Sequence, residues 1–425
     1  MEREALIQRL LDYIEENLKA DITAEELAEM AGYSRSHFSR IFRERTGLTV
    51  SQYLCRRRLM HAAYEISRGM PVTDGALIYG FATKAGFYKA FLREFGMAPT
   101  VYAETHLLRP PYPIRLSQEE HIMLTKKQVE KLLLTHWNIC GPVADHYRPG
   151  TGERADDVWN AGDAFLRMSG NIPAARKAAL LAEAVIRAGI PAEEPVRTVK
   201  GDILAEEGET GFALYRKSGE PFLSRELTGN AREAELLGQY VGRLDRTLAS
   251  VRGIDCPVMD LHAHLKDWAV PVVREKGEME LGFWSRYLEE LEHLLPKLPR
   301  QLIHRDPNAS NILKNGGCRN FGMAQENVRL FDPCYAATSV LSETWDDPDA
   351  REKWFDVLQT VLRGYDAENP LTGEEKEAVP FMVFSIQLIC TAYFGGTEKF
   401  RELYHTNLGM LRFLAENRER LRFGI

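Results

Sequence analysis

The chain has 425 residues, more than one hydrophobic core usually serves, so we expect two or three domains. Its formal net charge of -7 argues against a generally basic coat for nucleic acid, and any contact with DNA must come from local patterning. The six cysteines form no Cys-x-x-Cys pair, so neither a zinc site nor a disulfide scaffold is expected, and a reducing cytoplasm fits best.

The longest apolar run covers residues 381–394. It is too short to span a bilayer, and it contains Ser, Gln and Thr. No charged-then-apolar signal segment opens the chain. We therefore expect no membrane partner and interpret the run as a buried core helix.

Residues 5–102 show short amphipathic helices separated by glycines, without a strand period. An internal repeat lies within them. The recurring residues are Gly32-Tyr33, Phe38, Phe42, Gly47 and Tyr53 in the first copy, and Gly80-Phe81, Phe87, Phe91, Gly96 and Tyr102 in the second. This part of the chain therefore contains two copies of one helical unit.

The first copy has the signals of two helices joined by a tight turn. Thr23, with Glu26 three residues later, predicts the capped start of one helix, and Ser34 predicts the start of the next. Apolar side chains at helical spacing point inward in the second helix. Its outward residues are Arg35, Ser36, Arg40 and Arg43. The pattern is typical of a helix-turn-helix with a basic recognition face.

The second copy repeats this pattern, with Thr73 as the expected cap of its first helix. Gly75 lies inside that helix, where Gly costs about 1 kcal/mol relative to Ala. The outward residues of its second helix include Thr83, Lys84, Tyr88 and Lys89. A solvated helix face is the alternative for any one of these residues, but the same pattern occurs in both copies.

The tandem arrangement, the spacing of the aromatic residues and the ending Gly96-Met97-Ala98-Pro99 resemble the AraC-type DNA-binding domain over almost its whole length. The resemblance implies an all-α tandem helix-turn-helix domain over residues 1–107 that binds double-stranded DNA. It also implies that the two recognition helices enter successive major grooves on one face of the DNA, about one helical turn apart. The outward residues of both copies are then the DNA-binding residues.

A proline-rich stretch, Arg109-Pro110-Pro111-Tyr112-Pro113, ends the helical pattern and predicts a linker over 108–123. After it we expect an α+β domain over 124–425. The predicted elements are a helix at 124–137, strands at 137–143, 164–169, 196–201 and 211–216, and a helix at 177–188. From about residue 226 onward helical patterns dominate, interrupted by short strands near 312 and at 328–331.

His304-Arg305-Asp306 is followed by Asn311 at the spacing H-R-D-x-x-x-x-N, which occurs in the catalytic loops of kinase-fold phosphotransferases. In such a loop an Asp accepts the proton of the attacking hydroxyl, and an Asn one short turn later binds a magnesium ion that bridges the phosphates. We therefore interpret Asp306 as the candidate catalytic base and Asn311 as a candidate metal ligand. His304 and Arg305 are expected to support the loop.

A strand-rich lobe followed by a helical lobe with this motif resembles the aminoglycoside phosphotransferase and choline kinase family over about residues 124–421. The resemblance implies a bilobal protein-kinase-like fold, with a small lobe over 124–217 and a large lobe over 218–425, and ATP and Mg as cofactors. It also implies that Arg167 grips the nucleotide phosphates and that Glu183, on the next helix, orients Arg167. An outward-facing Arg and a solvated Glu are the alternatives at these positions.

In this family the next strand ends in a metal-binding Asp, usually followed by Phe. The matching tripeptide here is Asn320-Phe321-Gly322, in which a neutral amide oxygen replaces a carboxylate and should weaken binding of a divalent cation. A rival assignment uses Asp332, which keeps the carboxylate but lies farther downstream. The sequence around Asp332 better matches a later element of the family, whose Asp supports the catalytic loop, so we favour Asn320 as the metal position.

Two functions remain open on these residues. The first is a cytoplasmic transcription regulator whose kinase-like domain senses a nucleotide or a small hydroxylated or amino-containing molecule. The second is an active ATP-dependent phosphotransferase that acts on a small-molecule hydroxyl and is fused to a DNA-binding domain. Asn320 argues against catalysis, whereas the complete motif around Asp306 argues for it.

Overall fold

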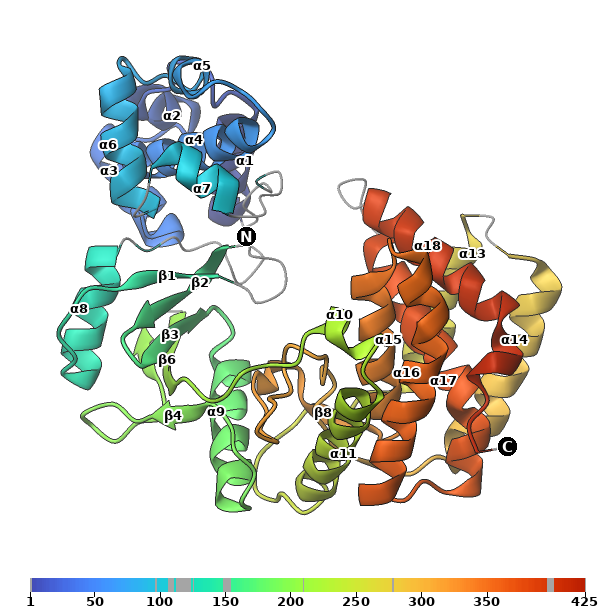
Figure 1. Ribbon diagram of the computed structural model, residues 1–425. Helices are drawn as coiled ribbons and strands as arrows, with labels where there is room; N and C mark the ends of the chain where they lie inside the picture. The colour runs from blue at the N-terminus through green and yellow to red at the C-terminus, as the bar shows by residue number, and fades with distance from the viewer. Residues whose placement is uncertain are drawn as a thin grey trace. The chain divides into compact units, whose positions relative to one another are not determined.

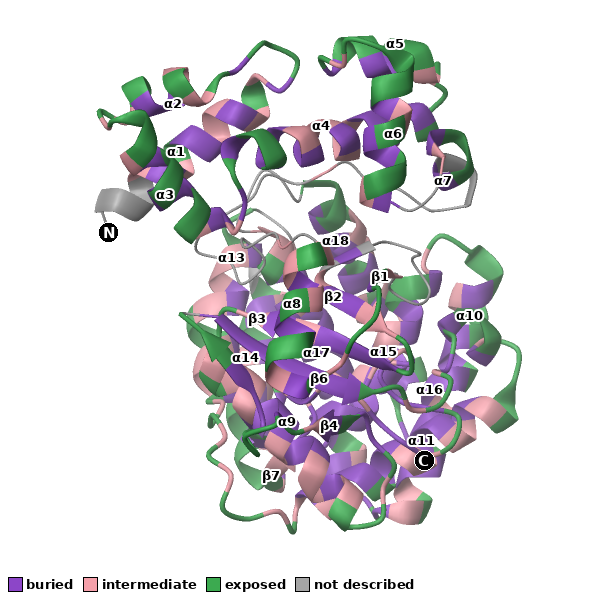
Figure 2. Ribbon diagram, turned by 90° about the vertical axis from the view of Figure 1, so that its left-hand side faces the viewer, coloured by how far each residue is buried: buried purple, intermediate pink, exposed green. Residues whose placement is uncertain are grey.

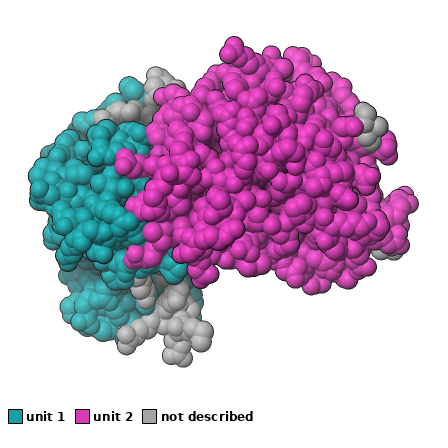
Figure 3. All heavy atoms as spheres, turned by 90° about the horizontal axis from the view of Figure 1, so that it is seen from below, with its two compact units in different colours: residues 1–175, 195–217 teal, residues 176–194, 218–425 magenta. Residues whose placement is uncertain are grey.

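A computed structural model describes residues 2–95, 98–105, 111, 124, 126–147, 154–208, 210–276, 279–395 and 401–424. The chain forms two compact units, one of residues 1–175 and 195–217 and the other of residues 176–194 and 218–425 (Figure 1, Figure 3). The expected linker, 108–123, lies outside the described residues apart from Pro111.

The first unit begins with short helices, as the sequence predicted. They are α1 (Glu2–Glu16), α2 (Ala24–Met30), α3 (Arg35–Thr46), α4 (Val50–Ser67), α5 (Val72–Ile78), α6 (Lys84–Phe95) and α7 (Pro99–Thr105). The repeat is visible in the packing of its aromatic rings. Ring centroids lie 5.6 and 5.5 Å apart along Phe38, Phe42 and Tyr53, and 5.5 and 5.6 Å apart along Phe87, Phe91 and Tyr102. Each copy therefore has its own aromatic core of the same geometry.

The helix caps predicted for the first copy are present. The Thr23 hydroxyl accepts a hydrogen bond from the N–H of Glu26 (3.1 Å), and the Ser34 hydroxyl accepts one from the N–H of His37 (3.4 Å). The Glu26 carboxylate accepts a hydrogen bond from the Tyr13 hydroxyl (2.8 Å). It therefore ties α2 to α1 instead of completing the cap.

The cap predicted at Thr73 is wrong. The helix α5 begins one residue earlier, at Val72, directly after Pro71, whose φ of -58° already matches that of a helix. Thr73 therefore lies inside α5. The next helix, α6, does have a hydroxyl at its start, where Thr83 accepts a hydrogen bond from the N–H of Gly86 (3.0 Å).

Arginines on α4 hold the first copy together. Arg57 is 1% exposed, and its guanidinium donates to both carboxylate oxygens of Glu15 on α1 (2.5 and 2.7 Å). Arg58 donates to the backbone carbonyls of Leu18 (2.9 Å) and Ala20 (2.6 Å). The basic run on α4 thus fixes α1 and the segment that follows it.

The rest of the first unit is an antiparallel sheet with one helix. The helix is α8 (Lys126–Trp137), and the strands are β1 (Ala144–Tyr147), β2 (Arg154–Ala161), β3 (Ala164–Ser169), β4 (Glu194–Val196), β5 (Ala205–Glu207) and β6 (Thr210–Arg216). The strand order is β1-β2-β3-β6-β4, with β5 paired to β6. Val129 and Leu133 of α8 share a buried cluster with Trp159 and Leu166 of the sheet.

The predicted helix at 124–137 and the predicted strands at 164–169 and 211–216 are confirmed. Two other predicted strands are wrong. Residues 138–143 form an irregular connection, because α8 continues to Trp137 and Asn138 has a left-handed φ of 55°, which a strand does not allow. Residues 197–201 contain a turn closed by a hydrogen bond from the Gly201 N–H to the Thr198 carbonyl (2.8 Å).

The second unit is mostly helical. Its helices are α9 (Ile172–Arg187, which begins in the first unit), α10 (Ser224–Leu227), α11 (Ala231–Leu248), α12 (Leu261–Ala263), the π-helix η2 (His264–Ala269), α13 (Val270–Arg274), α14 (Leu281–Leu294), α15 (Phe331–Thr344), α16 (Pro348–Glu368), α17 (Gly373–Gly395) and α18 (Arg401–Glu416). Short 3-10 turns lie at Leu295–Lys297, Phe321–Met323 and Arg418–Leu421.

Two short strands, β7 (Arg300–Ile303) and β8 (Gln325–Val328), pair antiparallel in the second unit. The segment between them carries the H-R-D motif. The strand predicted at 328–331 is displaced, because β8 ends at Val328 and Phe331 already begins α15. Near residue 312 the chain forms isolated bridges, in which Ile312 pairs with Cys318 and Leu313 with Pro221.

The helix α17 has the length and hydropathy of a membrane-spanning helix, but 78% of its most apolar window is buried inside the protein. All residues from 378 to 389 are buried, and Figure 2 draws buried residues in purple. The core helix predicted from the run at 381–394 is therefore confirmed.

Glycines allow α11 and α16 to touch backbone to backbone. A Cβ atom on Gly238 of α11 would collide with the backbone carbonyl of Val361 on α16, and one on Gly364 would collide with the carbonyl of Glu235. Only residues without a side chain permit this approach. The contact fixes the distance between the two helices, and with it the positions of Asp245 on α11 and Tyr365 on α16.

Replacing Gly238 with Ala should destabilise the second unit by about 1–3 kcal/mol, because the added methyl group must push two packed backbones apart. Urea denaturation of the purified protein measures the loss. Gly229→Ala is the matched control, because a Cβ at Gly229 meets no atom within 4 Å. Equal stabilities of the two variants would contradict this contact.

Candidate active site and nucleic-acid interface

His304 is fully buried at the start of the segment that follows β7. Its Nδ1 accepts a hydrogen bond from the N–H of Asp306 (3.3 Å), so the other ring nitrogen, Nε2, carries the hydrogen and donates to the Arg319 carbonyl (2.8 Å). The ring of Phe321 lies against the imidazole, with centroids 5.0 Å apart. His304 therefore ties the catalytic-loop motif to the residues on either side of Asn320.

Arg305 and Asp332 fix the backbone of the motif. Arg305 has a φ of 73°, a conformation that few non-glycine residues adopt. The N–H groups of His304 and Arg305 both donate to the carboxylate of Asp332 on α15 (2.8 and 2.9 Å), and Asp332 is fully buried. The Arg305 guanidinium lies 4.3 Å from the ring centroid of Phe331. One buried carboxylate thus holds two consecutive amides in place.

The side chains of Asn308 and Asn311 orient Asp306. Asn308 donates to one carboxylate oxygen of Asp306 (2.8 Å). Asn311 donates to the Asp306 backbone carbonyl (2.8 Å) and to the second carboxylate oxygen (2.9 Å). Because both amide hydrogens of Asn311 turn toward Asp306, its Oδ1 is directed away from that residue and is the atom that can bind a cation.

Tyr335 of α15 also faces Asp306. Burial, and after it the negative charge of Asp306, raises the pKa of the Tyr335 phenol well above its ordinary value. Tyr335 therefore stays protonated and is a neutral hydrogen-bond donor next to the candidate base.

Asn320 lies between β7 and β8 and has a left-handed backbone, with φ 63° and ψ 62°. Asn adopts this conformation more readily than most residues. It precedes the buried Phe321. The atoms of Asn311 and Asn320 that could bind a metal ion are their side-chain amide oxygens. Mg²⁺ binds such oxygens, but they carry no formal charge. Within the described ranges no group of three or more His, Cys, Asp or Glu side chains could hold a metal ion.

Lys177 on α9 is a residue that the sequence analysis did not single out. It is 8% exposed, and its ammonium donates to the backbone carbonyls of Gly322 (2.9 Å) and Ala324 (2.6 Å). Burial lowers the pKa of Lys177. The signal in the sequence is a lysine on the apolar stripe of a helix, next to Ala178 and Leu181. The predicted helix start at residue 177 hid this signal and is wrong, because α9 begins at Ile172.

Arg167 lies on β3 in the first unit. Its guanidinium is 5.4 Å from the ring centroid of Phe165 and 5.5 Å from that of Tyr215, and these two residues face each other across β3 and β6. Glu183 lies on the part of α9 that belongs to the second unit. The structure thus brings His304, Arg305, Asp306, Asn311 and Asp332 together, whereas Arg167 and Glu183 are described in separate units.

The residues predicted to bind DNA lie on α3 and at the start of α6. Those on α3 are Arg35, Ser36, Arg40 and Arg43, and all four are exposed. Arg35 pairs with Glu25 of α2 (2.5 Å), and Arg40 lies 3.2 Å from the His37 ring nitrogen. Both contacts are at the surface, so a phosphate could replace them at little cost.

On the second copy Thr83, Lys84 and Lys89 are exposed, and Tyr88 is half-buried. The Lys84 ammonium lies 5.8 Å from the Tyr88 ring centroid. Tyr88 packs on Phe87, with centroids 6.5 Å apart, so its ring belongs to the aromatic core on one side. The charged groups of both candidate recognition helices therefore remain at the surface.

Two known families match the chain. Residues 158–371, just over half of it, match the family described as Phosphotransferase enzyme family, and residues 27–105 match the one described as Helix-turn-helix domain. The probable transcription factor PqrA of Proteus vulgaris is 33% identical over 104 residues, which are 24% of this chain and 85% of PqrA.

Solved structures of two kinases are similar in fold. A microcompartment-associated aminopropanol kinase is 15% identical, with a TM-score of 0.51, and the match covers 70% of this chain and 99% of that one. An amicoumacin kinase in complex with AMP-PNP, Ca²⁺ and Ami is 15% identical, with a TM-score of 0.50, over 69% of this chain and 93% of that one. The helical N-terminal region and the α+β kinase-like fold predicted from the sequence are confirmed.

Lys177→Met should destabilise the second unit by about 1–3 kcal/mol, because methionine fills the space but leaves two buried carbonyls without a donor. Lys200→Met is the control, since Lys200 is exposed in a turn. Thermal denaturation of both variants tests this, together with amide hydrogen exchange over residues 320–324. Unchanged exchange in Lys177→Met would show that the ammonium does not hold this segment.

Proposed function

Because the chain belongs to the phosphotransferase enzyme family and carries an AraC-type helix-turn-helix domain, we propose that it is a sequence-specific transcription regulator whose kinase-like domain binds a nucleotide, a small molecule, or both. The observation that carries the proposal is a pair of exposed basic helices in the same chain as a phosphate-handling loop that lacks one metal carboxylate. A cytoplasmic location fits this role.

DNA binding is supported by where the charge lies. The chain is acidic overall, yet the exposed residues of α3 are basic or hydroxyl-bearing with the exception of Glu44, and Thr83, Lys84 and Lys89 are exposed at and after the start of α6. A basic face on an acidic protein attracts the phosphate backbone locally and leaves the rest of the surface repelled by it. The equal geometry of the two aromatic cores gives both recognition helices equivalent supports, as a tandem reader of double-stranded DNA requires.

The residues at the candidate metal position support a domain that binds its ligand without catalysing phosphoryl transfer. Asn311 and Asn320 would hold a magnesium ion, which when bound neutralises phosphate charge. Two neutral amides bind it more weakly than a site with a carboxylate. Lys177, which lies beneath the segment after Asn320, adds a positive charge nearby that further disfavours a divalent cation. Nucleotide or ligand occupancy can then serve as the signal.

An active phosphotransferase is the second candidate function, and the ordering of Asp306 favours it. Asn308 and Asn311 hold both carboxylate oxygens in place, which pre-organises a base for an incoming hydroxyl. In this function Asp306 would accept the proton of the acceptor hydroxyl. Arg167 would contact the nucleotide phosphates, with Glu183 as its orienting partner.

Arg40→Ala and Lys84→Ala should each weaken binding to DNA from upstream of the protein's own gene. A lost phosphate contact lowers the slope of log affinity against log salt by about 1, whereas a lost base contact costs about 1–3 kcal/mol and relaxes specificity at one position. Gel-shift titrations at several salt concentrations separate the two cases. Lys200→Ala, exposed outside the helix-turn-helix region, is the control and should leave both quantities unchanged. Wild-type affinity and slope in both recognition-helix variants would rule out this interface.

Asn320→Asp should strengthen magnesium-dependent nucleotide binding, because it adds a formal charge at a position whose left-handed backbone Asp also tolerates. A thermal-shift titration with ATP, with and without magnesium, measures this. Asn315→Asp, in the nearby exposed hairpin, is the control for adding a charge.

Turnover of ATP with aminoglycosides, choline and homoserine distinguishes the two functions. Turnover by the wild type that Asp306→Ala abolishes identifies a phosphotransferase. If the wild type shows no turnover and Asn320→Asp does, the result supports a sensor whose active site is inactive because residue 320 lacks a carboxylate. No magnesium dependence in either protein would show that residue 320 is not the metal position.

A further inference from the structure

Asp245, near the end of α11, is a fully buried carboxyl group that lies behind the catalytic-loop motif. The Tyr365 hydroxyl donates to its Oδ2 (2.8 Å), and Gln301 of β7 donates to its backbone carbonyl (2.7 Å). Its other oxygen, Oδ1, is buried and has no hydrogen-bond donor among the described residues, and the carboxyl group of Asp332 is the acidic neighbour that acts on it. Two buried carboxyl groups therefore meet directly behind His304 and Arg305.

Two carboxyl groups can share a hydrogen bond only if one of them carries a proton. Asp332 accepts two backbone N–H groups and lies in the first turn of α15, where a helix favours negative charge. Asp245 lies in the last turn of α11, where a helix disfavours negative charge. Both positions place the negative charge on Asp332 and the proton on Asp245.

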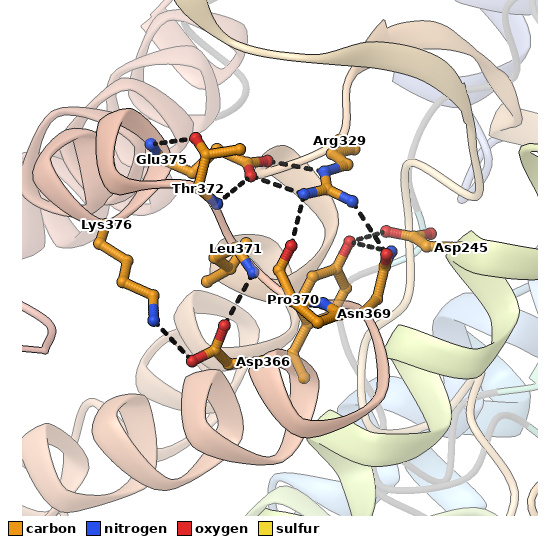
Figure 4. A network of polar contacts seen from close by, with 10 residues as sticks. Asp245, Arg329, Asp366, Asn369, Pro370, Leu371, Thr372, Glu375 and Lys376 are labelled. Carbon is orange, nitrogen blue, oxygen red and sulfur yellow. Dashed lines mark hydrogen bonds and ion pairs between the residues drawn. The ribbon is translucent and has the colours of Figure 1, made fainter.

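The nearby cation does not change this assignment. Arg329 donates to both carboxylate oxygens of the buried Glu375 (2.8 and 2.7 Å) and to the side chain of Asn369 (2.9 Å) (Figure 4). Asn369 in turn donates to the Tyr365 hydroxyl (3.0 Å). The charge of Arg329 is thus balanced by Glu375, and only neutral groups connect Arg329 to Asp245.

The groups that face Asp245 are Asp332 from α15, Tyr365 from α16 and, farther away, Arg329. Burial, and after it the charge of Asp332, raises the pKa of Asp245 well above its ordinary value. Burial raises the pKa of Asp332 as well, but the interaction with His304, and after it the contact with Asp245 and the hydrogen bonds from the two backbone amides, oppose that rise. These pKa shifts and the positions of the two residues on their helices both place the proton on Asp245.

We infer that Asp245 is a positioning residue that keeps its proton in the folded protein and donates it to Asp332, so that Asp332 stays aimed at the amides of His304 and Arg305. The importance of Asp245 for phosphate binding rests on the proposed function. The test of its positioning role does not, because the stability of the fold and the exchange of the two amides can be measured without nucleotide or DNA.

The sign of the pH dependence follows from the raised pKa of Asp245. An unfolded Asp loses its proton near pH 4, while Asp245 in the folded protein keeps it to a higher pH. Between these two pH values the folded state holds one proton more than the unfolded state. This contribution to stability is complete below about pH 4 and is lost as pH rises through the folded pKa.

Asp245→Asn supplies a neutral N–H donor without a titrating group, so it isolates this effect. Between pH 5 and 9 the folding equilibrium constant of the wild type should fall relative to that of Asp245→Asn by up to about tenfold per pH unit. Urea denaturation at each pH measures it, with Asp356→Asn, exposed on α16, as the control that follows the wild type. Parallel pH profiles of wild type and Asp245→Asn overturn the inference.

Two further measurements keep the inference testable if Asp245→Asn folds poorly. Tyr365→Phe removes a hydrogen-bond donor that favours the ionised form of Asp245. The stability of this variant should therefore continue to fall up to a higher pH than that of the wild type. Infrared spectra of the wild type should show a buried protonated carboxyl group at neutral pH. No such band, or a Tyr365→Phe profile shifted downward, overturns the inference.

Hydrogen exchange separates positioning from simple packing. In Asp245→Ala the amides of His304 and Arg305 should exchange faster than the rest of β7 and α15, whereas Asp245→Asn should keep them protected. Uniformly faster exchange throughout the unit in Asp245→Ala shows a packing role only and overturns positioning.

Discussion

The geometry of the candidate site depends on one buried carboxylate that receives two consecutive backbone amides. The N–H groups of His304 and Arg305 can point to the same acceptor only because Arg305 has a left-handed φ, and that conformation is stable only while Asp332 holds it. A buried anion needs compensation, which the two amides, the start of α15 and the neighbouring Asp245 supply. Asp306 follows Arg305 directly in the chain. The position of the Asp306 carboxylate therefore depends on Asp332, which lies on α15.

Much of this arrangement could be predicted from local sequence, because it consists of short patterns with fixed spacing. The aromatic repeat predicted both small cores, and the H-R-D-x-x-x-x-N pattern predicted which residues meet around Asp306. Lys177 and Asp245 could not be predicted in the same way. Their partners, Gly322 and Asp332, lie far away along the chain, and a lysine or an aspartate on a helix is usually at the surface. Only the packed helices show that these two are buried.

The segment around Asn320 illustrates how a neutral residue changes the balance of charge in a phosphate-handling fold. A carboxylate at this position would attract a cation, and its charge would also attract the buried Lys177 ammonium, which lies at the backbone of residues 322 and 324. With Asn320 present, the Lys177 ammonium donates to the backbone carbonyls of Gly322 and Ala324. Hydrogen bonds from Lys177 and His304 thus hold the backbone of this segment on both sides of Asn320.

The two helix-turn-helix copies differ where the chain enters their first helices, and the difference has a physical origin. In the first copy a threonine caps α2, and the Glu26 carboxylate anchors that helix to α1 through Tyr13. In the second copy Pro71 fixes the entry to α5, and Gly75 faces Ile66 of α4, whose side-chain atoms lie 3.4 Å from the place of a Cβ. The second copy therefore relies on α4, which also carries the buried Arg57, for the support that α1 provides to the first. Residues of α4 belong to the buried cluster of each copy, so a change in α4 affects the support of α3 and of α6 at once.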